Sequence, residues 1–320
     1  MPSSQPSEPE ICQRLGEIQI EIAQLIEERL ALRAQLDPSR LEALHRGGEP
    51  QGVAYLGPEH SYSHSAARKY FGDRQLLCPV GTISAVFEEV HRGQSRYGVV
   101  PIENSTDGRI VDTMFNFIKR PLQICGEVLL PIHHNLLSIS DRLSIRKVYS
   151  KPQALSQCRR WLSEHLPEAQ RIEVASTTHA AKIAKQEPGA AAIASLEASL
   201  EYGLPIVCES IEDDPNNATR FAIIGKDQPA ITGRDKTAIL FQVPHQPGAL
   251  ADAMLIFRDN GINLTWIESL PVPGSPNEYY FFVEIEGHRD EAPMVDAIGA
   301  LVERSLRLDV LGSYPRGIEG

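Results

Sequence analysis

Asp214 to Gly225 reads DPNNATRFAIIG, a polar turn that runs directly into an apolar strand. Pro and Asn favour turns, whereas Thr and Phe favour strands, so the stretch predicts a buried strand with a polar entrance. Turn chemistry does not explain the arginine. A guanidinium can bind a carboxylate, and the neighbouring hydroxyl can donate a hydrogen bond at the same place. Thr219 and Arg220 therefore indicate a site for an anionic ligand.

Short apolar runs alternate with helical stretches upstream of this strand, from residue 52 onward. The expected strands are 53–56, 97–101, 124–137, 147–150, 190–194, 206–211 and 220–224, and the expected helices include 63–70, 82–92, 152–165 and 177–186. Such alternation predicts an α/β fold with parallel sheets and a ligand at the carboxyl ends of the strands. The length of the region suggests two lobes with a cleft between them.

The order of elements changes after a polar linker, residues 226–235. Strands are expected at 236–243, 262–272, 278–286 and 306–313, with helices at 248–260 and 291–305. This is the ferredoxin-like order βαββαβ. Because such a unit leaves a sheet edge and helices free to pair with a second copy, we expect an oligomer.

Composition limits the classes of function. The net charge of -11 over 320 residues, without a run of Lys and Arg, argues against a nucleic-acid surface. The five cysteines are far apart, so neither a zinc site nor a disulfide framework is expected. We expect no membrane span and no export segment, which favours a cytoplasmic protein.

The first residues have a pattern of their own. Apolar side chains recur at intervals of four and three between residues 11 and 36, which predicts one amphipathic helix that ends at Asp37-Pro38. The polar stretch 44–51 follows as a linker.

Three further strand ends carry polar groups: GPEHSYSH (57–64), VVPIENSTDG (99–108) and YSKPQALSQ (149–157). Ser61 either caps a helix or helps to hold an anion at the helix start, and Ser150 either lies beside a helix cap or faces a ligand. Glu103 follows an apolar run, so it could be partly buried with a shifted pKa. His133 and His134 should point to opposite faces of an extended segment, and no metal-ligand or nucleotide-binding spacing is present.

These motifs resemble those of prephenate dehydratases that carry a C-terminal ACT regulatory domain. The resemblance runs from about residue 52 to 313 and includes LPIHHNLL (130–137), NNATRF (216–221), GALADAM (248–254) and IESLP (267–271). It implies that prephenate loses CO2 and water to give phenylpyruvate, on the route to L-phenylalanine, with no cofactor and no metal. It also implies a bilobal, periplasmic-binding-protein-like catalytic domain over 51–226 and an ACT domain over 235–315, after an N-terminal helical segment over 1–46.

The resemblance and the strand-end motifs together assign roles to residues. The candidate catalytic residues are Thr219, Arg220, Glu103 and Asn104. The candidate substrate-binding residues are Phe221, Ser61, Ser105, Thr106, Ser150 and Gln157. For L-phenylalanine as an allosteric effector, the resemblance points to Gly248, Ala249, Leu250, Asn263, Leu264, Glu268 and Ser269. A homodimer or homotetramer through the ACT domain is expected.

Three positions depart from the family pattern. His60 stands where glycine is usual, Lys151 stands where histidine is common, and Leu270 stands where arginine is typical. Histidine lacks the backbone freedom of glycine, so His60 is expected to alter substrate contacts. Lys151 is expected at the surface, and the loss of the arginine at Leu270 is expected to weaken the effector site.

Alternatives remain open at this point. The N-terminal helix resembles the first helix of a fused chorismate mutase, but it is too short for the whole bundle, so it is either a mutase remnant or an oligomerising helix. The substrate could be arogenate, in which an amino group replaces the keto oxygen of prephenate. The fold would also suit a non-catalytic amino-acid sensor.

Overall fold

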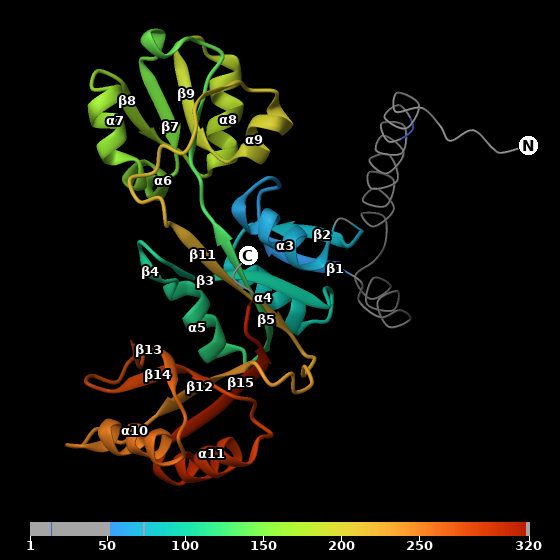
Figure 1. Ribbon diagram of the computed structural model, residues 1–320, viewed down its shortest axis with the longest axis vertical. Coiled ribbons are helices and arrows are strands. Elements are labelled where there is room, and N and C mark those ends of the chain that lie inside the picture. Colours follow the sequence, from blue (N-terminus) through green and yellow to red (C-terminus); the bar gives the residue numbers. More distant parts are fainter. Residues whose placement is uncertain (1–13, 15–51, 73, 318–320) are drawn as a thin grey trace, which may run out of the picture. The chain divides into compact units, whose positions relative to one another are not determined.

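The computed structural model describes residues 52–72 and 74–317, together with Arg14. The helical segment expected over 1–46 therefore lies outside the described residues, apart from Arg14. The described chain forms three β-sheets with helices packed on them (Figure 1). Within the described ranges, none of the helices has both the length and the apolar character that crossing a membrane requires.

The first sheet has six strands in the order β2-β1-β3-β11-β5, with β4 paired to β3. Its strands are β1 (Gly52–Leu56), β2 (Leu76–Val80), β3 (Tyr97–Asn104), β4 (Gly108–Arg109), β5 (Gln123–Pro131) and β11 (Ala218–Gly225). Its helices are α3 (Tyr62–Phe71), α4 (Ile83–His91) and α5 (Val111–Lys119). The expected parallel pairing holds for β1 with β2 and β3, but β11 runs antiparallel between β3 and β5. The reason is that β11 re-enters this sheet from the other lobe.

The second sheet has five strands in the order β10-β6-β9-β7-β8. Its strands are β6 (Asn135–Leu137), β7 (Lys147–Ser150), β8 (Gln170–Glu173), β9 (Ala190–Ala194) and β10 (Ile206–Cys208). Its helices are η1 (Arg142–Ser144), α6 (Pro152–Gln157), α7 (Arg159–His165), α8 (Thr177–Gln186) and α9 (Leu196–Tyr202). The chain passes between the two sheets through residues 132–134 and 209–217, which confirms the two-lobed α/β fold.

The third sheet is antiparallel, with four strands in the order β13-β14-β12-β15. Its strands are β12 (Asp235–Gln242), β13 (Leu264–Pro271), β14 (Tyr279–Glu286) and β15 (Arg307–Pro315), and its helices are α10 (Ala249–Asp259) and α11 (Ala292–Arg304). The helices α10 and α11 pack beside each other on one face of the sheet (Figure 1). The element order is the βαββαβ order expected from the sequence.

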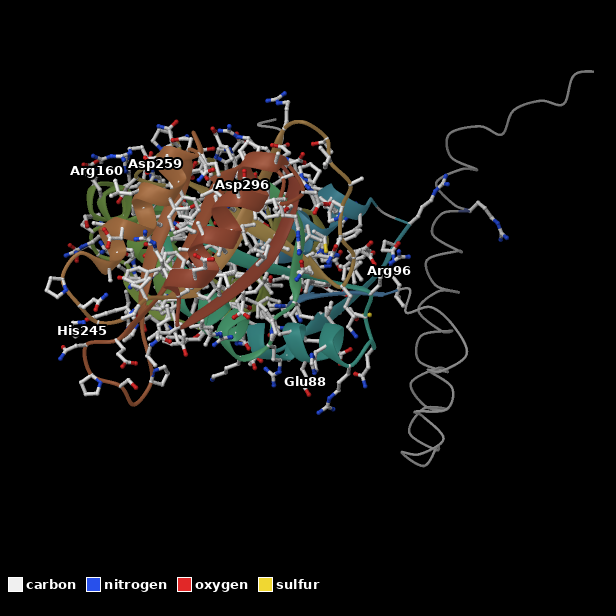
Figure 2. The ribbon with its side chains drawn as sticks, turned by 90° about the horizontal axis from the view of Figure 1, so that it is seen from below. Glu88, Arg96, Arg160, His245, Asp259 and Asp296 are labelled. Atoms are coloured by element: carbon white, nitrogen blue, oxygen red, sulfur yellow. The ribbon has the colours of Figure 1, made fainter. Side chains whose placement is uncertain are left out.

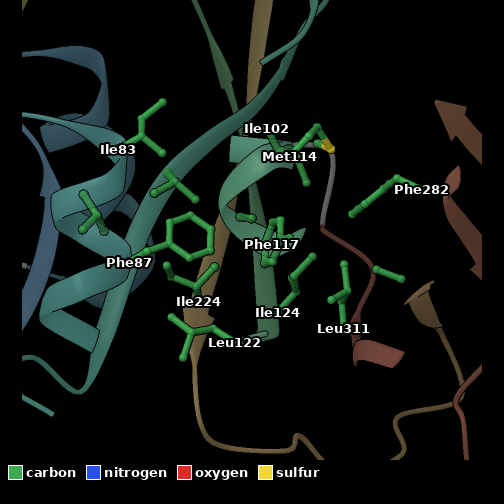
Figure 3. Packing of buried hydrophobic residues seen from close by; sticks show 14 of the residues in the cluster. Ile83, Phe87, Ile102, Met114, Phe117, Leu122, Ile124, Ile224, Phe282 and Leu311 are labelled. Carbon is green, nitrogen blue, oxygen red and sulfur yellow. The ribbon is translucent and has the colours of Figure 1, made fainter. Parts of the chain in front are cut away.

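The opposite face of the third sheet shares a hydrophobic core with the first lobe. Figure 3 shows Phe282 and Leu311 of this sheet beside Phe117 and Ile124 of the first lobe. The rings of Phe117 and Phe282 have centroids 6.2 Å apart. Gly312 allows a close approach here, because its φ is +138° and an added Cβ would lie 2.4 Å from the Ile124 carbonyl oxygen. Apolar packing therefore joins the βαββαβ domain to the lobe that carries β11.

Candidate active site

A cavity of about 390 Å³ lies between the two lobes. Its lining combines polar groups with an apolar part that includes Ile83, Pro101 and Ile132. The polar lining residues are Ser61, Tyr62, Ser63, Asn104, His134, Lys151, Gln153, Gln157, Ser176, Thr177 and Thr219. The second lobe supplies Lys151, the two glutamines, Ser176 and Thr177, and most of the others come from the first lobe. The cavity therefore combines polar side chains with apolar surface, which suits a small amphipathic ligand.

Thr219 lies at the cavity next to Asn104, which is its cross-strand partner on β3. The Asn104 Nδ2 group donates a hydrogen bond to Thr219 Oγ1 at 2.9 Å. This amide orientation is fixed, because Asn104 Oδ1 accepts backbone N–H groups from Thr106 and Asp107, each at 3.0 Å. Among the described residues, no acceptor binds the Thr219 hydroxyl hydrogen, so that hydrogen can point to a ligand.

A buried polar network supports Asn104 from the second lobe and from the segment between the lobes. Gln157 Nε2 donates to Asn104 Oδ1 at 3.3 Å, and Gln157 Oε1 accepts from Asn217 at 3.2 Å. His134 Nε2 lies 2.9 Å from the same Gln157 oxygen, and its Nδ1 lies 2.9 Å from the Tyr62 hydroxyl. Burial lowers the pKa of His134, and burial raises the pKa of Tyr62, so both groups are favoured in their neutral forms. The network fixes the relative position of the two cavity walls around Thr219.

Arg220 does not reach the cavity, which corrects the expectation that the turn delivers both Thr219 and Arg220 to one place. Successive side chains of a strand point to opposite faces, so Thr219 and Phe221 line the cavity while Arg220 faces away. Arg220 Nη1 lies 2.6 Å from Glu284 Oε1, and Arg220 Nε lies 3.1 Å from Glu103 Oε2. The guanidinium therefore binds protein carboxylates.

Four other predicted site residues do not line the cavity and instead bind other groups of the protein. Glu103 pairs with Arg220 across the strands and is not among the cavity-lining residues. The hydroxyls of Ser105 and Thr106 bond to the turn before β11, through Asn216 O and Asn217 Oδ1. Ser150 is fully buried and donates to Ile193 O at 2.8 Å. Five of the predicted site residues do line the cavity: Ser61, Asn104, Gln157, Thr219 and Phe221.

Lys151 and His134 line the cavity although neither was among the sequence-based candidates. Lys151 follows β7 and precedes α6, so it stands at a strand end that faces the cleft, and the expectation of a surface position is wrong. The position of Lys151 directly after Ser150, in a motif already assigned to the cleft, was the available signal. His134 required the tertiary structure, because either histidine of the 133–134 pair could have faced inward.

His60 adopts the left-handed backbone conformation that glycine prefers, with φ of 61°. Its Nε2 lies 3.5 Å from Glu201 Oε2, on α9 of the second lobe. A histidine at this position therefore adds a contact between the lobes.

A second, smaller cavity of about 110 Å³ lies in the βαββαβ domain, where Ala249 and Leu250 contribute to its lining. His245, on the exposed loop before α10 (Figure 2), also lines this cavity. The other effector candidates do not line this cavity: Gly248, Asn263, Leu264, Glu268 and Ser269.

Two residues of the predicted effector motif on β13 face the first lobe. Glu268 Oε2 lies 2.6 Å from Arg109 Nη1, and Leu270 is 1 % exposed within the shared core. The leucine at this position therefore packs between the βαββαβ domain and the lobe that carries β11.

Comparison with known proteins agrees with this two-lobed site. The family model for prephenate dehydratase matches residues 53–229. A bifunctional chorismate mutase/prephenate dehydratase from Pseudomonas aeruginosa is 42% identical over 272 residues, covering 84% of this chain and 74% of the relative. The corresponding Aquifex aeolicus protein is 44% identical over 267 residues, covering 83% of this chain and 74% of the relative.

A solved structure gives the same result. The prephenate dehydratase of Arthrobacter aurescens in complex with L-Phe aligns with a TM-score of 0.78 and 30% sequence identity, covering 83% of this chain and 90% of that chain. The family model and the relatives, together with the two-lobed fold, define a lyase with its cleft between the lobes. The chain belongs to the prephenate dehydratase family, and the activity of that family is the decarboxylative dehydration of prephenate.

Proposed function

We propose that the Thr219 hydroxyl hydrogen-bonds to the ring hydroxyl of prephenate and assists its departure as water. The observation that carries this proposal is the Asn104 Nδ2 donor 2.9 Å from Thr219 Oγ1. This donor leaves the Thr219 hydrogen free for the substrate. It also stabilises negative charge that develops on Oγ1 as the proton moves toward the leaving oxygen.

The reaction moves electrons only within the substrate, so the protein need not supply or accept any. The bond between the ring and its carboxylate breaks, CO2 leaves, and the electron pair moves through the ring. The C–O bond breaks with its electron pair on the departing oxygen, which takes the Thr219 proton to become water, and Thr219 regains a proton from solvent. Aromatisation supplies the driving force, so the chain contributes orientation, a proton donor at the oxygen and a suitable environment for each carboxylate.

The cavity offers such environments. The helices α3 and α8 begin at it from opposite lobes, where Ser61 and Ser176 are the N-cap residues. A helix N-terminus favours an anion because the macrodipole is positive there. Phe221, Ile83 and Ile132 supply apolar surface for the ring.

The βαββαβ domain is proposed to act as an ACT domain that binds L-phenylalanine and reduces turnover. Support comes from the L-Phe complex of the Arthrobacter aurescens relative and from the small cavity beside Ala249 and Leu250, which Tyr279 and Phe281 also line. We further propose catalytic and regulatory domains over 51–226 and 235–315, assembly into a homodimer or homotetramer through the latter, and a cytoplasmic location.

Phenylpyruvate formation from prephenate by the purified full chain tests the proposal, with chorismate and arogenate as parallel substrates. We expect turnover of prephenate that added L-phenylalanine suppresses. Binding of prephenate without turnover would support a sensor instead, and turnover of arogenate alone would overturn the substrate assignment.

A further inference from the structure

Lys151 places a positive charge at the cavity that no protein group neutralises directly. Among the described residues that line the cavity, it alone is a lysine or arginine. Its ammonium has no hydrogen-bond or ion-pair partner within the described part of the chain. Asp107 attracts it electrostatically, but the Asp107 carboxylate already accepts hydrogen bonds from Gln157 Nε2 at 2.9 Å and from Gln153. The ammonium is therefore available to a ligand.

The surroundings of Lys151 are suited to a carboxylate. Burial lowers the pKa of Lys151, and Asp107 opposes that shift. Because burial destabilises the charged form, an anion that binds beside the ammonium stabilises it. Ser176 and Thr177, at the N-terminus of α8, line the same cavity from the same lobe. One wall of the cleft thus combines a cation, two residues with hydroxyl groups and the positive end of a helix dipole.

The chemistry of the substrate indicates which of its two carboxylates fits this wall. For the ring carboxylate to leave as neutral CO2, the electron pair of the bond that joins it to the ring must pass into the ring. A cation bound to this carboxylate would stabilise the ground state more than the transition state and so would slow the reaction. The side-chain carboxylate keeps its charge throughout, so an ion pair with it holds the substrate without opposing the chemistry.

We propose that the Lys151 ammonium binds the side-chain carboxylate of the substrate and thereby selects a 2-oxo acid over a 2-amino acid. This inference rests on the proposed function of the cleft. In arogenate the carbon next to that carboxylate carries an ammonium, which would lie close to Lys151 and be repelled by it. No Asp or Glu is among the described cavity-lining residues, so the lining offers that ammonium no carboxylate partner.

The test compares kcat/KM for prephenate and for arogenate in the wild-type chain, Lys151→Gln and Lys151→Arg. We expect Lys151→Gln to raise KM for prephenate by about tenfold to a hundredfold, because a partly buried charge pair is lost. Its kcat/KM for arogenate should fall much less, so the preference for prephenate shrinks by at least about tenfold. Lys151→Arg should keep most of the preference. Lys147→Gln is the matched control, because Lys147 lies on β7, the strand directly before Lys151, and pairs with Glu187 at 2.6 Å.

A binding measurement separates this inference from the proposed function. Calorimetric titration of prephenate into Thr219→Val and into Thr219→Val/Lys151→Gln reports affinity without turnover. A weaker affinity in the double variant supports the role of Lys151 even if the wild-type chain proves inactive on prephenate, which would overturn only the proposed function. An unchanged affinity together with an unchanged substrate preference in Lys151→Gln would overturn the inference.

Discussion

The guanidinium of Arg220 lies 2.6 Å from the carboxylate of Glu284, so the residue after the candidate catalytic Thr219 is bound to the βαββαβ domain. Glu284 is 1 % exposed and also accepts a hydrogen bond from the Tyr314 hydroxyl at 2.9 Å. The Arg220 guanidinium lies over the Trp266 ring of the same domain, 4.8 Å from its centroid. One strand, β11, therefore presents Thr219 to the cleft on one face and binds the other domain on its opposite face.

Removal of the Arg220 side chain should strongly destabilise the fold. Arg220→Ala leaves Glu284 and Glu127 buried with fewer positive partners, and breaking a buried ion pair on one side costs about 3–5 kcal/mol in the free energy of unfolding. Urea unfolding measures this loss. Adding Glu284→Gln to Arg220→Ala should recover part of it, and strictly additive losses in the double variant would show that the pair is not coupled.

The ion pair between Arg109 and Glu268 should behave differently, because its side chains are 41% and 19% exposed. We expect Glu268→Gln to change the free energy of unfolding by less than about 1 kcal/mol. Arg109 lies on β4, two residues after Asp107, whose carboxylate accepts a hydrogen bond from the cavity-lining Gln157. Loss of the ion pair should therefore change the concentration of L-phenylalanine that gives half-maximal inhibition. Turnover without L-phenylalanine should stay near the wild-type value. Inhibition curves that superimpose would contradict a coupling role for this pair.

Asn104→Asp should reduce kcat and also lower stability, because the buried Asn104 Nδ2 group donates to Asn217 Oδ1 and Ala218 O as well as to Thr219. The substitution keeps the acceptor for the backbone groups of Thr106 and Asp107 but removes the donor to Thr219. A carboxylate oxygen there would accept the Thr219 hydroxyl hydrogen and withdraw it from the substrate. Loss of one such donor lowers kcat by about a hundredfold or more. Steady-state kinetics at saturating prephenate gives the answer, and a kcat equal to wild type would remove Asn104 from the mechanism.

Glu127 should make stability depend on pH in acid. Burial raises the pKa of Glu127, but Lys236, the Gly317 backbone N–H and Arg220 outweigh it, so the pKa lies below its usual value of 4.5. The stabilisation is therefore complete above pH 4.5 and is lost as the pH falls through the lowered pKa. Glu127→Gln should be less stable than wild type at neutral pH, and the difference should shrink in acid. Urea unfolding at neutral pH and in acid measures the difference in stability between the variant and wild type. A difference that stays constant would contradict a lowered pKa for Glu127.

Much of the architecture follows from periodicity in the sequence. The alternation of strands and helices predicted the α/β class, the length of the region suggested two lobes, and the last segment predicted the βαββαβ order. The antiparallel insertion of β11 was missed, because strand direction depends on where the chain re-enters a sheet rather than on local residues. Two short strands were also missed: β8 lacks an apolar run, and β2 contains Pro79, which argues against a strand.

The site predictions were most accurate for polar residues at neighbouring strand ends that form hydrogen bonds with each other. Thr219 and Asn104 were placed together correctly, whereas Arg220 was assigned to the cleft against the alternation that its own strand imposes. That error was avoidable from the sequence. The contact of Arg220 with Glu284 was not predictable, because it joins residues 64 positions apart across two domains.

The most direct test of the central claim is phenylpyruvate formation from prephenate by the wild-type chain and by Thr219→Val, which keeps the shape of the side chain and removes its hydroxyl. We predict that kcat falls by about a hundredfold or more, while Thr219→Ser retains measurable turnover and both variants unfold near the wild-type urea concentration. A folded Thr219→Val that forms phenylpyruvate at the wild-type rate would contradict the account.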